Sequence, residues 1–194
     1  MSVIFGVAEP KHLILCGDRR LSTKEGSLIS DDATKIQVIN DHLAVASAGN
    51  AAIEKVVEIE SSKKPSGNQT VETILTILRE FYSKVDALGL DAIRNMTYCA
   101  LIAGKGDDGN AKLISLSHVK GELSYQDVPM GLYSPADLDY KECAEVFVRN
   151  YKLHRDRFCE LTVQEVSKKS VFVSPTGTIW TYDIQTGTGK VTEF

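Results

Sequence analysis

The chain has 194 residues, of which 43% are hydrophobic and 25% are charged, and its formal net charge is −4. This length fits one soluble domain over residues 1–194 with a substantial core, and the negative charge argues against a nucleic-acid partner, which needs a basic surface. No apolar stretch approaches the roughly 20 residues that cross a bilayer, and no basic segment followed by an apolar one marks a secretory signal, so we expect a cytoplasmic protein.

Predicted strands dominate the first part of the chain. Short apolar or alternating runs bounded by turn residues indicate strands, and a glycine followed by asparagine marks the start of a helix. In chain order we predict strands over 3–8 and 12–17, a loop or irregular hairpin over 19–33, strands over 35–39 and 42–48, and a helix of about fifteen residues from Gly49 that ends at 63–67.

The clearest helical periodicity lies over 70–88. Thr70 is a good N-cap residue and Glu72 lies in the first turn, where an acidic side chain is favourable. The apolar residues recur at helical spacing and predict one buried stripe. This stripe comprises Val71, Ile74, Leu75, Leu78, Tyr82, Val85 and Leu88.

The rest of the chain repeats the same order of strands followed by helices. We predict strands over 97–104, 111–117 and 122–127, helices over about 134–151 and 161–169, and strands over 170–174, 178–184 and 190–193. Blocks of strands that alternate with pairs of helices favour an α+β fold with antiparallel sheets. The four-layer αββα sandwich fits this order, and so does a two-layer α+β fold.

The cysteines and histidines give no sign of a metal site. The four cysteines are far apart in the sequence and lack the spacing of metal ligands, so we expect free thiols that are mostly buried. The histidines at 12, 42, 118 and 154 are scattered, and we expect them at surface or turn positions. The glycines around 104–106 lack the spacing of a phosphate-binding loop, and we expect no cofactor.

Four residues at the ends of predicted strands suggest chemistry. Removal of the initiator Met1 exposes Ser2, whose hydroxyl is a nucleophile and whose own α-amino group, with an intrinsic pKa of about 7.7–8.0, is a base. Asp18 ends the second apolar run, Lys35 opens the third strand, and Gly49 follows the fourth.

These residues resemble the proteasome β-subunit family of N-terminal nucleophile (Ntn) hydrolases, which includes bacterial proteasome-like peptidases. The similarity covers a hydroxyl residue before an apolar pair and Gly-Val, Asp-x-Arg after the second strand, Lys-Ile at the third, and Ala-Gly after the fourth. The spacing agrees closely over residues 2–57, and the order of elements remains compatible to the C-terminus. The resemblance implies the αββα sandwich, with antiparallel sheets between helical layers.

The resemblance also implies a role for each residue. Ser2 would be the nucleophile, and Lys35 would lower the pKa of its hydroxyl and of the nearby α-amine. Asp18 would hold Lys35 and compensate its charge. The backbone N–H of Gly49 would donate to the oxyanion of the tetrahedral intermediate, and Arg20 would support the site.

Two segments depart from the family pattern. Leu132 stands where the family has a serine in a Gly-Ser-Gly turn. In the family's Asp-x-x-Ser-Gly segment, here within 170–175, the serine survives as Ser174 but the aspartate is absent. The missing groups normally orient the α-amine and a proton-carrying water, so their loss argues for an alternative in which the chain is inactive.

The function that the sequence predicts is an amide hydrolase with an N-terminal serine, a peptidase of the threonine/serine type. The alternatives are an inactive proteasome-like scaffold or assembly subunit, and a ligase that transfers the acyl group to an amine. The expected substrate is a peptide or small amide. Family analogy predicts a homo-oligomeric ring, and the sequence does not identify an ATPase partner.

Overall fold

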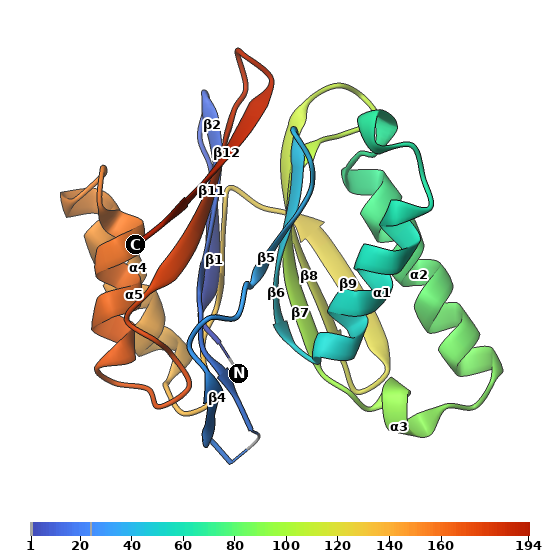
Figure 1. The fold of residues 1–194 in the computed structure, drawn as a ribbon, viewed down its shortest axis with the longest axis horizontal. Coiled ribbons are helices and arrows are strands. Elements are labelled where there is room, and N and C mark those ends of the chain that lie inside the picture. The colour runs from blue at the N-terminus through green and yellow to red at the C-terminus, as the bar shows by residue number, and fades with distance from the viewer. Residues whose placement is uncertain (1, 24) are drawn as a thin grey trace.

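The computed structural model describes residues 2–23 and 25–194, and it forms four layers (Figure 1). Two five-stranded antiparallel sheets lie face to face. Two helices cover the outer face of the first sheet and two others cover the outer face of the second. The mixed α/β architecture with antiparallel sheets confirms the fold class that the order of elements and the resemblance predicted.

The first sheet has the strand order β10-β1-β2-β11-β12. It therefore joins the start of the chain to its end, because β2 pairs with β1 on one side and with β11 on the other. The bounds are β1 Ile4–Ala8, β2 His12–Asp18, β10 Met130–Tyr133, β11 Gly177–Asp183 and β12 Thr188–Glu193.

The second sheet has the strands in sequence order, β5-β6-β7-β8-β9. Its members are β5 Ile36–Asn40, β6 Leu43–Gly49, β7 Tyr98–Lys105, β8 Ala111–Val119 and β9 Glu122–Asp127. The polar segment that precedes it contains the two short strands β3 (Leu21–Ser22) and β4 (Leu28–Ser30), paired with a register shift. This is the irregular hairpin that the sequence allowed for 19–33.

The helices are arranged in two groups. The first group, over the β5–β9 sheet, consists of α1 Ala51–Ser62, the short 3-10 helix η1 Ser66–Asn68, α2 Val71–Ala87 and the one-turn α3 Asp91–Arg94. The second group consists of α4 Tyr140–Leu153 and α5 Phe158–Ser167, and it covers the sheet that contains β1. Within the described residues, none of the helices combines the length and apolar character that a membrane span requires.

Apolar side chains fill each of the three spaces between the layers. Small residues such as Ala44 and Ala46 and larger ones such as Leu101 and Trp180 are buried where the sheets face each other. Burial of these side chains supplies the main driving force for folding. The close fit of the two sheets brings the starts of β1 and β5 and the ends of β2 and β6 into one region.

Three predictions about elements were wrong, and three elements, including the 3-10 helix η1, were not expected. Residues 170–174 do not form a strand. The next predicted strand, over 178–184, is present as β11, which begins at Gly177. The third long helix begins at Tyr140, because the Asp139 carboxylate caps it by accepting hydrogen bonds from the N–H groups of Lys141 and Glu142. Leu88 is 72% exposed, because α2 ends at Ala87. Strand β10 and helix α3 were not predicted.

His118 is the exception among the histidines, which we expected at surface or turn positions. Its side chain is buried and stacks on Tyr82 with ring centroids 3.7 Å apart. Its Nδ1 forms a hydrogen bond of 3.0 Å with the carbonyl of Met96. The thiols agree with expectation, since all four cysteines are free and Cys16, Cys143 and Cys159 are buried.

Candidate active site

Asp18 is the centre of a buried hydrogen-bond network. Its carboxylate accepts from the backbone N–H groups of Val3 (3.1 Å), Arg20 (2.8 Å) and Ser174 (3.3 Å). Its own N–H donates to the carbonyl of Val3 at 3.2 Å. These bonds tie the end of β2 to the residue that follows Ser2 and to the loop before β11.

Burial and hydrogen bonding act in opposite directions on this carboxyl group. The pKa of Asp18 is raised from 3.8 to about 6, because burial outweighs the three N–H donors and the charge of Lys35, which lower it. Desolvation disfavours the charged form, and donated hydrogen bonds favour it. At pH 7 the carboxyl group is therefore mostly ionised, as a partner for a cation must be.

Lys35 lies immediately before β5, and its side chain passes over strand β2. A Cβ atom added to Gly17 would lie 2.9 Å from the Cβ of Lys35, so the glycine provides the space for the lysine stem. The carbonyl of Lys35 accepts a 3.0 Å hydrogen bond from Ser47 N–H. The positive charge of Lys35 lowers the pKa of Asp18, so the ammonium lies within electrostatic reach of the carboxylate.

Glu54 is a second acidic side chain near Lys35, and sequence reasoning missed it. Burial raises its pKa, while a hydrogen bond with Ser47 and the charge of Lys35 lower it. The sequence contains a signal, because Glu54 lies in the first turn of the helix that follows Gly49. The charge of Lys35 thus lowers the pKa of two partly or fully buried carboxyl groups from different layers.

Ser2 is only 3% exposed, and the structure places it directly before the Val3 N–H that Asp18 binds. This position fits a side chain held within the protein at the start of β1. Met1 lies outside the described residues. The expected release of the Ser2 α-amino group therefore stays a prediction.

Gly49 occupies a backbone position that other residues rarely adopt. Its φ is +115°, and an added Cβ would lie 2.5 Å from the carbonyl oxygen of Thr97. Both observations require glycine where β6 ends. The next residue, Asn50, caps α1 through a 2.8 Å hydrogen bond from Ala52 N–H to its side-chain oxygen. The role of the Gly49 N–H as an oxyanion donor stays a prediction.

Arg20 and Ser174 lie on either side of Asp18. The guanidinium of Arg20 donates to both carboxylate oxygens of Asp31, at 2.7 and 2.9 Å, and to the carbonyl of Val171 at 3.0 Å. The hydroxyl of Ser174 accepts from Arg19 N–H (3.0 Å) and donates to the carbonyl of Thr176 (2.9 Å). Both residues thus stabilise the backbone that surrounds the carboxylate.

Leu132, which stands where the family has a serine, lies within strand β10. Leu132 pairs with Phe5 and belongs to the core beneath α4 and α5. Tyr133 pairs with Ile4 and is the last residue of β10.

Gly17→Ala is expected to disturb the site through packing alone. The added methyl group would contact the Lys35 stem and lie 3.3 Å from Ile4 Cγ2, and such overpacking costs about 1–3 kcal/mol. We expect a corresponding loss in the free energy of unfolding measured by urea titration. Gly67→Ala is the matched control, because nothing lies within 4 Å of its added Cβ. Equal stability of the two variants would contradict this packing.

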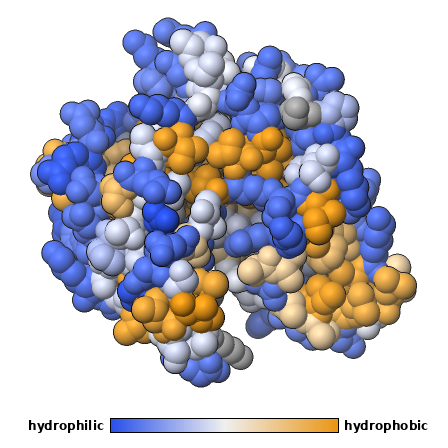
Figure 2. All heavy atoms as spheres, viewed as in Figure 1, coloured by the Kyte–Doolittle hydropathy of each residue, from blue (hydrophilic) through white to orange (hydrophobic). Residues whose placement is uncertain are grey.

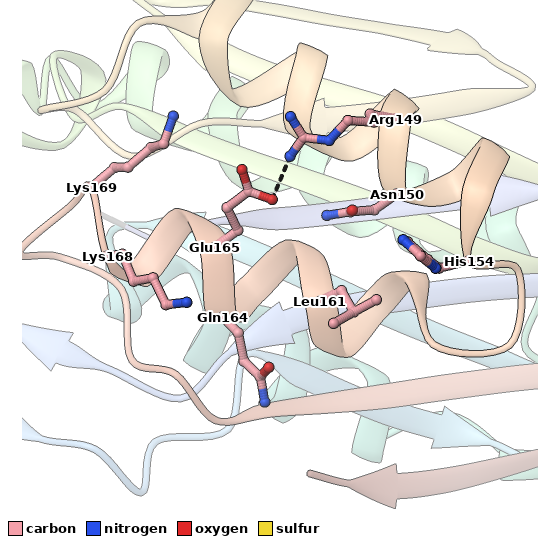
Figure 3. A pocket seen from close by; sticks show the side chains of 8 residues that line it. All are labelled: Arg149, Asn150, His154, Leu161, Gln164, Glu165, Lys168 and Lys169. Atoms are coloured by element: carbon pink, nitrogen blue, oxygen red, sulfur yellow. Dashed lines mark hydrogen bonds and ion pairs between the residues drawn. The ribbon is translucent and has the colours of Figure 1, made fainter.

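Other surface features are separate from this network. A groove of about 590 Å³ is lined by α4, α5 and the two lysines that follow α5, and an ion pair between Arg149 and Glu165 spans it (Figure 3). Exposed apolar residues include Leu28 and Ile29 of the β3–β4 hairpin, and Figure 2 shows apolar patches between hydrophilic areas. Among residues 2–23 and 25–194, no three histidine, cysteine or acidic side chains are grouped so as to hold a metal ion.

Two facing antiparallel sheets between pairs of helices, with a buried serine before the first strand, define the architecture of the Ntn-hydrolase class. The family model described as "Proteasome subunit" matches residues 2–127. This is more than half of the chain, which therefore belongs to the proteasome subunit family, as the motifs around Ser2 and Asp18 predicted. The match includes Lys35 and Gly49 and ends before β10. Among curated proteins, no match to the chain was found.

Proposed function

We propose that the protein is an amide hydrolase that uses Ser2 as its nucleophile, a peptidase of the threonine/serine type. The observation that supports this most is the buried carboxylate of Asp18, which binds the backbone directly after Ser2 and interacts with the charge of Lys35. A lysine that is held by an acid lowers the pKa of a neighbouring hydroxyl and of an α-amine. Membership of the proteasome subunit family agrees with this chemistry.

The proposed reaction is acyl transfer in two steps. The Ser2 hydroxyl gives its proton to the free α-amine and attacks the amide carbonyl, and the tetrahedral oxyanion accepts a hydrogen bond from Gly49 N–H. The leaving amine takes the proton as the acyl-enzyme forms. Water then attacks the ester and releases the acid, which regenerates the hydroxyl. Lys35 stabilises the developing negative charge, and Asp18, Arg20 and Ser174 hold Lys35 and the surrounding backbone.

Peptide turnover with defined N-termini tests the proposal. Wild-type protein is prepared with and without Met1, and intact mass confirms which N-terminus each preparation has. Each form is then incubated with a library of fluorogenic peptides. We expect cleavage by the form that begins at Ser2 only, because Met1 converts the required amine into an amide. Absence of turnover and of covalent labelling in that form would leave the inactive scaffold as the better account. Addition of an amine acceptor separates hydrolysis from ligation, since a ligase gives a new amide product.

Acidification is expected to slow the acylation of Ser2. The carboxyl group of Asp18 has a pKa of about 6, and its protonation removes the negative partner of Lys35. The α-amine also gains a proton in acid, which acts in the same direction. The rate constant for labelling by a β-lactone probe should therefore fall as the pH drops below about 6. A rate that stays constant from pH 7 to 5 would contradict this role for Asp18.

We also propose that the protein is one domain in the cytoplasm and assembles into a homo-oligomeric ring. The support is its family, which suggests ring-like assembly in general. Sedimentation of the purified chain gives its mass in solution. A monomer at micromolar concentration would contradict assembly of this chain alone.

A further inference from the structure

The loop between α5 and β11 is held by aspartate carboxylates at both of its ends. At its far end, Ser174 N–H donates to Asp18. At its start, Asp137 accepts a 2.6 Å hydrogen bond from the Ser170 hydroxyl and a 2.9 Å hydrogen bond from Val171 N–H. Asp137 belongs to the segment between β10 and α4, so it joins two parts of the chain that are far apart in sequence.

This loop depends on side chains for its order. Residues 170–174 form no strand, so they lack the ladder hydrogen bonds that would fix a strand. Ser170 is buried, and its hydroxyl accepts a 3.1 Å hydrogen bond from Phe172 N–H while it donates to Asp137. Arg20 holds the carbonyl of Val171 from the other side. The Asp137 carboxylate thus anchors a short loop four residues before the Ser174 N–H.

We propose that Asp137 is a positioning residue for the site, which anchors Ser170 and Val171 so that Ser174 N–H stays aimed at the Asp18 carboxylate. The inference rests on the proposed function insofar as Asp18 supports chemistry at Ser2. Its structural part, a coupling from Asp137 through the loop to Asp18, stands on the hydrogen bonds alone.

The coupling has a direction that can be measured. Loss of the anchor weakens the hydrogen bond from Ser174 N–H, which normally lowers the pKa of Asp18. The charged and titratable groups that interact with Asp18 are Lys35, Arg20 and Cys16, and the substitution leaves them in place. Removal of the Asp137 carboxylate should therefore raise the pKa of Asp18.

The test compares Asp137→Ala with Asp137→Asn in the full chain. ¹³C NMR titration of the Asp18 carboxyl group should give a pKa about 0.5 higher in Asp137→Ala, because the weakened hydrogen bond stabilises the anion less. The asparagine retains an acceptor for Val171 N–H and should restore most of the wild-type value. Asp156→Ala, at an exposed aspartate of the α4–α5 connection, is the control and should change nothing.

Labelling kinetics provide the second readout. In Asp137→Ala, the acid limb of the pH profile for probe labelling should shift to higher pH together with the pKa of Asp18. This shift gives about a threefold slower rate at pH 5.5. An unchanged Asp18 titration in folded Asp137→Ala overturns the inference even if Ser2 is labelled. An unlabelled wild-type protein rejects the proposed function, but the titration still decides on Asp137. If Asp137→Ala fails to fold, Ser170→Ala must show the same upward shift, in smaller degree, for the inference to hold.

Discussion

Replacement of Lys35 by methionine is expected to lower the rate of Ser2 acylation by about 10²–10⁴-fold, the range attributed to one positioned proton-transfer or charge-stabilising group. Methionine retains an unbranched stem that can pack over Gly17, so the charge is removed with little change in shape. The measurement is the second-order rate constant for labelling by a β-lactone probe. Lys55→Met is the control, because Lys55 forms an exposed ion pair with Glu58 on α1.

The Lys35 variant also has a readout that is independent of activity. Because the lysine charge lowers the pKa of Asp18, that pKa should rise in Lys35→Met. Labelling of folded Lys35→Met at a rate within tenfold of the wild type would contradict the role of the ammonium. A normal rate together with an unchanged Asp18 pKa would show that the two side chains do not interact.

Asp18→Ala is expected to produce the largest loss of stability. It leaves three N–H groups, of Val3, Arg20 and Ser174, without their acceptor in a buried region. A buried donor without a partner costs about 1–3 kcal/mol, so the free energy of unfolding at pH 7 should fall by about 2–4 kcal/mol. Urea titration measures this loss. Asp32→Ala is the control, since the Asp32 side chain is 90% exposed.

The stability loss in Asp18→Ala should depend on pH in an unusual direction. The pKa of Asp18 is higher in the folded chain, at about 6, than its ordinary value of 3.8, so the folded state binds the proton more tightly. The stabilisation by this group is therefore fully present below about pH 4 and is reduced as the pH rises through 6. The difference between wild type and Asp18→Ala should grow by about 2.4 kcal/mol from pH 7 to 4. A difference that shrinks in acid would contradict the raised pKa.

Local patterns in the sequence were sufficient for the elements that bury one face. The apolar run over 97–104 and the alternation over 111–117 predicted β7 and β8 closely, and the stripe from Val71 to Val85 predicted α2. His118 could also have been predicted, because it continues the buried face of Ile114 and Leu116 along β8. The strand predicted over 111–117 ended one residue before His118, whereas β8 extends to Val119.

Features that depend on contacts between distant segments could not be predicted. The apolar run over 170–174 resembles a strand, but Asp137 and Asp18 hold it as a loop from positions far away in sequence. The motifs identified Asp18, Lys35 and Gly49, yet only the structure shows that Asp18 binds three N–H groups and that Glu54 also interacts with Lys35. Spacing along the chain does not contain this information.

Tandem mass spectrometry of the protein after reaction with a hydroxyl-directed β-lactone or epoxyketone probe tests most directly whether Ser2 is the nucleophile. For chains that begin at Ser2, we predict a single adduct on the N-terminal peptide at Ser2 and none in Ser2→Ala, whose fold is checked by circular dichroism. An adduct on another residue, or labelling that persists in folded Ser2→Ala, would contradict the assignment.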